Sequence, residues 1–145
     1  MLKKFKDKTI LVLGAGNSTL DVKWENLDYD YLWTCNQFFL LDRIDNVKVD
    51  LVTLGYNVNL YDKKLHKKLT EDSPLTLIET HHYREKIHSK ELKDFSSKFD
   101  VHQIHIPLDS LAGAASRLVK LALMCDAKKV YFAGVDGFNK TFTNK

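Results

Sequence analysis

The sequence has few cysteines and no sign of a second domain. Its 145 residues contain only Cys35 and Cys125, which lie far apart among apolar neighbours. That count excludes a disulfide scaffold, and two free, buried thiols in a reducing compartment explain these residues better. Low-complexity tracts, internal repeats and shifts in composition are also absent. Residues 1–145 are therefore expected to form a single domain.

Long apolar runs are absent as well. The basic N-terminus leads into Ile10–Leu13, a run of four apolar residues that passes directly into glycines. A signal peptide needs a longer apolar core, and a membrane-spanning helix needs about 20 apolar residues. The sequence thus predicts a cytoplasmic protein with no integral membrane segment.

Neither charge dominates, and the basic residues are not concentrated. The chain has 22 lysines and arginines against 19 acidic residues, with a formal net charge of +3. Four lysine pairs are scattered along the chain without interleaved aromatic residues, so no nucleic-acid partner is expected. Each pair is predicted to lie on a solvated face. The pairs are Lys3-Lys4, Lys63-Lys64, Lys67-Lys68 and Lys128-Lys129.

What the chain does contain is an alternation of short apolar strands with amphipathic helices. Such an alternation is typical of βαβ units with right-handed crossovers. We therefore predict an α/β fold of Rossmann-like type, a three-layer sandwich with a mostly parallel sheet. Strands are expected at 9–13, 31–35, 49–54, 75–78, 101–106 and 129–134. Helices are expected at 57–69, 89–99 and 110–125, the last capped by Asp109 or Ser110.

In an open parallel sheet, ligands bind beyond the carboxyl ends of the strands. The first such segment, Gly14-Ala15-Gly16-Asn17-Ser18, has glycines that let an anion approach backbone N–H groups and a serine that can donate its hydroxyl. It lacks the third glycine of a dinucleotide motif, since Leu20 stands near that place. Gly14, Gly16, Asn17 and Ser18 are therefore candidate phosphate-binding residues, and a tight structural turn is the alternative.

Later strand ends supply further candidates. Asn36 and Gln37 carry amides suited to a ribose or a base edge, or to capping their own loop. Ala112 and Gly113 put small residues at the start of a helix, which suits either a ligand or close helix packing. Asp136 follows the last strand and can accept hydrogen bonds from ligand hydroxyls or from its own backbone.

His81 and His82 are the candidate catalytic residues. They follow the fourth expected strand, and a general base needs an orienting partner, which Glu79 or Glu85 could supply. Exposed loop histidines are the alternative. No metal site is predicted, because adjacent histidines in an extended segment point apart and no third ligand stands at the usual spacing.

Several of these segments together resemble a known family. They occur in the same order in the bacterial lipooligosaccharide sialyltransferases of the Campylobacter and Haemophilus type, and the Cys-Asn-Gln-Phe stretch is the most specific. A looser similarity is to the family of motility accessory factors and hydroxymethylpterin diphosphokinases. The segments are Ile10–Ser18, Thr34–Phe39, Ala112-Gly113 and Lys129–Phe138.

The sialyltransferase resemblance implies a GT-A-like fold and a CMP-sialic acid donor, with no required cofactor or metal. Gly14, Gly16 and Ser18 would lie against the CMP phosphate, Asn36 would meet the nucleotide, and Ala112-Gly113 would line the sialic acid. The implied partners are a nucleotide sugar and a glycan acceptor, with a homo-oligomer as a further expectation.

The chain departs from that family at two places. Ala15 stands where the family has an asparagine, and the family's catalytic histidine and phosphate-binding tyrosines follow the last matched strand in a lid-like segment. The chain is thus a fragment, or a minimal relative that uses another base such as His81 or His82, or a protein without transferase activity. A nucleotide-binding module without catalysis and a Mg²⁺-dependent pterin or nucleotide phosphotransferase are the alternative functions.

Overall fold

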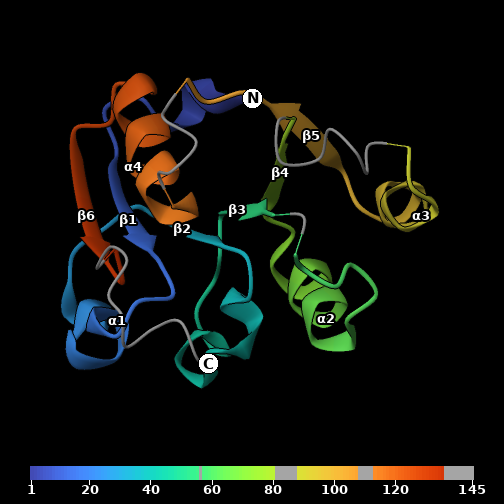
Figure 1. Ribbon diagram of the computed structural model, residues 1–145. Helices are drawn as coiled ribbons and strands as arrows, with labels where there is room; N and C mark the ends of the chain where they lie inside the picture. The colour runs from blue at the N-terminus through green and yellow to red at the C-terminus, as the bar shows by residue number, and fades with distance from the viewer. Residues whose placement is uncertain (56, 81–87, 108–112, 136–145) are drawn as a thin grey trace.

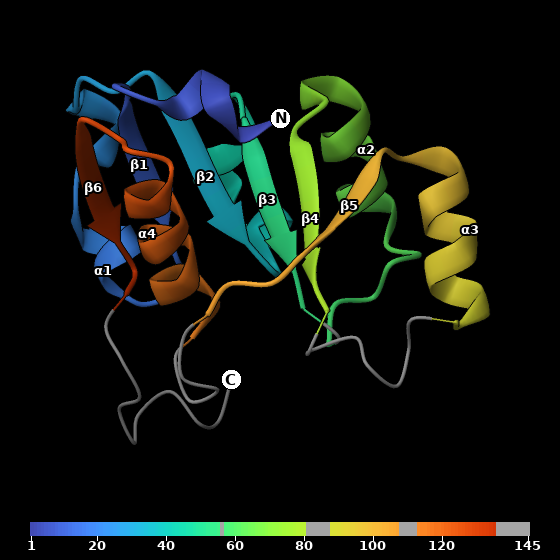
Figure 2. The same ribbon diagram turned by 90° about the horizontal axis from the view of Figure 1, so that it is seen from above.

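The computed structural model describes residues 1–55, 57–80, 88–107 and 113–135. Six strands in these ranges form one all-parallel sheet in the order β5-β4-β3-β2-β1-β6, and Figure 2 shows them side by side. The predicted mostly parallel sheet is confirmed. The strands are β1 (Thr9–Leu13), β2 (Tyr31–Cys35), β3 (Leu51–Leu54), β4 (Leu75–Glu79), β5 (Val101–Ile104) and β6 (Lys129–Ala133).

The helices begin where side chains or backbone geometry cap them. The Asp62 carboxylate accepts hydrogen bonds from the N–H groups of Lys64 and Leu65, so α2 begins at Lys63, six residues after the predicted start at 57. Ser89 caps α3 by accepting from the N–H of Leu92. The helices are α1 (Ser18–Asp21), α2 (Lys63–Asp72), α3 (Lys90–Lys98) and α4 (Ala114–Met124), and the 3₁₀ turns are η1 (Leu2–Phe5), η2 (Trp24–Asn26), η3 (Phe38–Leu40) and η4 (Asp42–Ile44).

Helix α4 begins later than the sequence predicted. Its N-cap is Gly113, whose φ of −64° and ψ of 162° are extended rather than helical. The expected cap at Asp109 or Ser110 is therefore wrong for this helix, and both residues lie outside the described ranges. Strand β5 likewise ends at Ile104 instead of residue 106, because the chain leaves the sheet and buries Ile106 against its face.

The strand order explains why helices cover both faces. From β1 to β5 the chain moves one strand at a time in a single direction, and right-handed crossovers then place the connections on one face. The connection from β5 to β6 runs back across the sheet, so α4 lies on the opposite face (Figures 1 and 2). Two buried clusters fill the layers, one beneath α2, α3 and most of the 3₁₀ turns and one beneath α4 and η1.

Strand β1 shows how the sequence produces this arrangement. Leu11 and Leu13 belong to one cluster, Ile10 and Val12 to the other, and all four are fully buried. A strand covered on both faces needs an uninterrupted apolar run, which is what the sequence provides. No helix in the described ranges is long and apolar enough to cross a membrane.

One lysine does not fit the solvated faces predicted from the sequence. Lys68 is only 6% exposed. Its ammonium group lies 3.0 Å from the Asp72 carboxylate and donates to the carbonyl oxygens of Asp45 and Val47. The prediction is wrong here because a neighbouring carboxylate and two carbonyls replace the water that the charge would lose.

Candidate functional site

The sheet has a topological switch point between β1 and β6, where the direction of strand addition reverses. The segments that follow these two strands are held together there. The N–H of Gly14 donates to the Ala133 carbonyl at 2.8 Å, and the N–H of Gly16 donates to the Gly134 carbonyl at 2.9 Å. In return, the N–H of Gly134 donates to the Ser18 hydroxyl at 2.7 Å. The predicted glycine turn therefore lies at the switch point.

Close packing accounts for the glycines at 14 and 134. A Cβ on Gly14 would overlap the Gly134 carbonyl and lie 2.9 Å from the Ala115 side chain. Gly134 has a φ of +72°, and a Cβ there would overlap the Thr19 hydroxyl, which donates to the Gly14 carbonyl at 2.8 Å. Both glycines are thus required by the contact between the two segments, whether or not a ligand binds.

The turn still presents backbone donors to solvent. Ala15 and Asn17 are exposed, and their N–H groups have no hydrogen-bond partner among the described residues. Asn17 is the N-cap of α1, and its side chain makes no capping bond. An anion at this turn would therefore meet the N–H groups of Ala15 and Asn17 rather than those of Gly14 and Gly16.

The start of α4 lies beside this turn, as the proximity of Ala115 to Gly14 shows. Gly113 is exposed, and the first helical bond runs from the N–H of Arg117 to the Gly113 carbonyl. The N–H groups of Ala114, Ala115 and Ser116 precede that bond and have no acceptor within the helix. Two predicted patches, Gly14–Ser18 and Gly113, are thus brought together.

Asn36 connects the next two strand ends. It has a φ of +53°, which asparagine tolerates better than most residues. Its side-chain oxygen accepts from the N–H of Gly55 at 2.8 Å, so it joins the end of β2 to the end of β3. The side-chain NH₂ group has no partner in the described ranges. Gln37 follows, half-buried, as the N-cap of η3.

The remaining predicted site residues cannot be placed. His81, His82, Ala112 and Asp136 lie outside the described residues, as does Glu85. Glu79, one of the two carboxylates expected to orient a histidine, is buried, and its carboxylate lies 3.2 Å from the Arg117 guanidinium. In the described ranges, no group of three or more histidine, cysteine or acidic residues could hold a metal ion.

Arg117 is the main residue at this edge that the sequence did not reveal. It adjoins the apolar stripe of α4, and a charged residue in that place is normally solvated. Here it is 3% exposed. A signal was present in β4, since Glu79 follows Leu77 by two residues and so shares its buried face.

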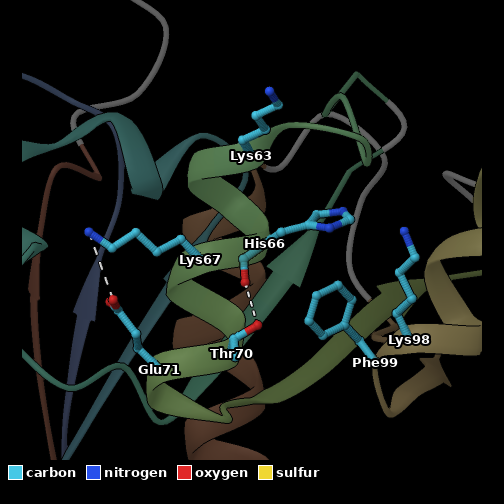
Figure 3. Close-up of a pocket in the computed structure, with 7 residues that line it drawn as sticks. All are labelled: Lys63, His66, Lys67, Thr70, Glu71, Lys98 and Phe99. Carbon is cyan, nitrogen blue, oxygen red and sulfur yellow. Dashed lines mark hydrogen bonds and ion pairs between the residues drawn. The ribbon is translucent and has the colours of Figure 1, made fainter.

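A separate groove lies between α2 and the end of α3 (Figure 3). Its volume is about 560 Å³. The His66 ring faces Phe99 edge to face at 5.0 Å between centroids, and its Nε2 lies 2.7 Å from the Leu60 carbonyl. None of its lining residues lies directly after the carboxyl end of a strand. They are Lys63, His66, Lys67, Thr70, Glu71, Lys98 and Phe99.

Comparison with known proteins finds similarity at the level of structure alone. No family model matches the sequence, and no curated protein matches it either. Among solved structures, the chain is similar to the Campylobacter sialyltransferase CST-II, crystallised in complex with a trisaccharide acceptor and CMP. The TM-score is 0.58 at 18% sequence identity, over 89% of this chain and 63% of that one. This chain thus spans less than two thirds of the sialyltransferase, and the two share an α/β fold.

Proposed function

We propose that this chain binds a nucleotide sugar of the CMP-sialic acid type at the carboxyl edge of β1, β2 and β6. The observation that carries the proposal is the pair of N–H groups, on the exposed residues Ala15 and Asn17, that lack partners among the described residues and lie in the turn beside the start of α4. Backbone donors and a helix N-terminus together form an anion site. The α/β fold shared with a sialyltransferase crystallised with CMP supports the choice of ligand.

In this proposal the remaining candidates surround the phosphate. Ser18, Gly14 and Gly16 hold the turn in shape. Asn17 and Gly113 lie on the ligand side. Asn36 keeps its oxygen on Gly55 and offers its NH₂ group to the nucleotide. Gln37, Ala112 and Asp136 complete the nucleotide and sugar contacts.

The proposed reaction is transfer of the sugar to a glycan acceptor. His81 or His82 would remove the proton from the acceptor hydroxyl, whose oxygen would bond to the anomeric carbon of the sugar. CMP would leave with the electron pair of the broken bond between that carbon and the phosphate oxygen. The proposed reaction uses no metal or other cofactor, as the resemblance to the sialyltransferases implies. The proposal places the protein in the cytoplasm, and a homo-oligomer is its expected state.

Two substitutions at Asn17 test the phosphate site directly. Asn17 has a φ of −60°, which proline also adopts, so Asn17→Pro removes the N–H while Asn17→Ala removes only the side chain. A hydrogen bond to a charged group contributes about 1.5–3 kcal/mol, so Asn17→Pro should weaken CMP binding by roughly tenfold or more relative to Asn17→Ala. Calorimetric titration with CMP measures the difference, and equal affinities of the two variants would contradict the site.

The alternative functions predict different outcomes in binding, transfer and thermal-shift assays. CMP binding without sugar transfer, unchanged in a His81→Ala/His82→Ala variant, would indicate a nucleotide-binding module. A Mg²⁺-dependent preference for ATP over CMP would indicate a phosphotransferase. The absence of any thermal shift with CMP, CDP, UDP or ADP at millimolar concentration would remove the nucleotide site altogether.

A further inference from the structure

A buried ion pair joins β4 to α4. Arg117 Nη1 lies 3.3 Å from Glu79 Oε1 and 3.2 Å from Glu79 Oε2. The same nitrogen donates to the Ile106 carbonyl at 3.2 Å. The side chains are 3% and 6% exposed. Both charges have therefore lost most of their water, and this loss makes a buried pair a poor source of stability compared with apolar side chains of similar volume.

The pair lies where three segments converge at the carboxyl edge. Glu79 is the last residue of β4, Ile106 belongs to the chain that crosses the sheet after β5, and Arg117 lies in the second turn of α4 (Figure 2). The Lys120 ammonium adds a contact from α4 to the Pro107 carbonyl. Two cationic side chains of one helix thus hold consecutive carbonyls of the crossing chain.

Two of these segments, β4 and α4, adjoin candidate site residues in the sequence. His81 and His82 follow Glu79 by two and three positions, and Gly113 begins the helix that carries Arg117. The main strand contacts of α4 are with β1, β2 and β6. The ion pair therefore adds a direct connection between α4 and β4.

We propose that Glu79 and Arg117 are positioning residues that fix the start of α4 relative to the end of β4 and thereby shape the nucleotide site. This inference rests on the proposed function for its ligand, but not for the contact itself. The pair acts through geometry, because neither side chain is exposed enough to meet a ligand. Its charges and directional hydrogen bonds define one arrangement, which apolar side chains of the same size would leave less specific.

The experiment replaces both charges together. The Glu79→Leu/Arg117→Met variant replaces both members of the ion pair with apolar side chains of similar volume, so the melting temperature should stay within about 3 °C of the original. Affinity for CMP should fall at least tenfold, because the first turn of α4 is no longer held in place. Amide hydrogen exchange should accelerate at least tenfold at Thr80 and at position 117, whose N–H groups bond to the Ile104 and Gly113 carbonyls, but not at Val12 in β1.

A matched control is available on α2. Lys67 and Glu71 form an exposed pair 3.8 Å apart, drawn in Figure 3. The Lys67→Met/Glu71→Leu variant removes the same two charges and should change neither affinity nor exchange. An Arg117→Lys variant keeps the charge but loses the planar fork, so it should show an intermediate loss. It also serves as the test if the double variant fails to fold.

The two measurements separate the possible failures. Unchanged affinity in the double variant, with or without faster exchange, would overturn the positioning role, as would lost affinity without faster exchange. If the original protein binds no CMP, the proposed function fails. The rate of amide exchange at Thr80 and at position 117 then decides by itself whether the ion pair holds the end of β4 and the start of α4 together.

Discussion

The two halves of the carboxyl edge are held together by different forces. At β1 and β6, backbone hydrogen bonds join two glycine-containing segments that lie too close for side chains. At the end of β4, a buried guanidinium and carboxylate join β4 to α4, and the guanidinium also holds the chain that follows β5. Substitutions that add volume should therefore lower the stability of the β1 and β6 half. Substitutions that leave a buried charge unbalanced should lower the stability of the β4 half.

The largest effect is expected where one charge is left without its partner. Arg117→Ala leaves the Glu79 carboxylate buried opposite a cavity, so we expect the free energy of unfolding to fall by about 3–5 kcal/mol. Urea unfolding followed by circular dichroism measures this change. The exposed Lys67→Ala substitution, which breaks the surface pair with Glu71, should cost less than about 0.5 kcal/mol. A loss below about 1 kcal/mol for Arg117→Ala would contradict the importance of charge balance in this half.

Added volume should have the next largest effect. Gly134→Ala forces a side chain into a positive-φ position and against the Thr19 hydroxyl, so we expect a loss of about 3 kcal/mol in the same unfolding assay. Gly113→Ala is the control, since no described atom lies within 4 Å of its Cβ position and its φ is negative. Its loss should stay below about 1 kcal/mol. Equal losses for the two glycines would show that the β1 and β6 segments are not closely packed.

Asn36 lies between the two halves and should show an intermediate effect. Asn36→Ala removes the acceptor for the Gly55 N–H and puts alanine at a positive φ, so we expect a loss of about 1–2 kcal/mol. Asn36→Asp keeps the acceptor and should be nearly as stable as the original. It removes the NH₂ donor, however, and should bind CMP more weakly. Undiminished CMP affinity in Asn36→Asp would show that the NH₂ group does not meet the nucleotide.

Alkaline pH gives the smallest expected effect. Burial raises the pKa of the Cys35 thiol from 9.0 to about 12. Between these values the unfolded chain loses this proton and the folded chain keeps it, so stability falls as pH rises. Relative to Cys35→Ala, the original protein should lose about 1 kcal/mol more between pH 8 and pH 10. Parallel stability curves for the two proteins would show that the thiol is accessible at the end of β2.

Strands and helix starts that depend on residues close together in the chain could be predicted from the sequence. The apolar run at Thr9–Leu13 is sufficient to indicate a strand buried on both faces, and Ser89 marks the start of α3. The start of α2 was predicted too early, because Val58 is buried in a loop at helical spacing and Asp62 supplies the actual cap.

Contacts that depend on the order of the strands in the sheet could not be predicted from the sequence. The pairing of Glu79 with Arg117 joins residues 38 positions apart, and the buried Lys68 relies on carbonyls more than 20 positions away. The glycine at 14 was identified as a candidate for phosphate binding, but its contact with Gly134 follows from β6 pairing with β1. The sequence thus indicated that these segments meet at one edge of the sheet, while the contacts that join them there could not be predicted from it.

The central claim is that the carboxyl edge at β1, β2 and β6 binds a nucleotide. Nuclear magnetic resonance of the ¹⁵N-labelled chain titrated with CMP tests it most directly. We predict saturable shifts of the Ala15, Asn17, Gly55 and Gly113 amides, with His66 and Lys98 in the groove between α2 and α3 unchanged. Shifts confined to that groove, or no shifts at millimolar CMP, would contradict the claim.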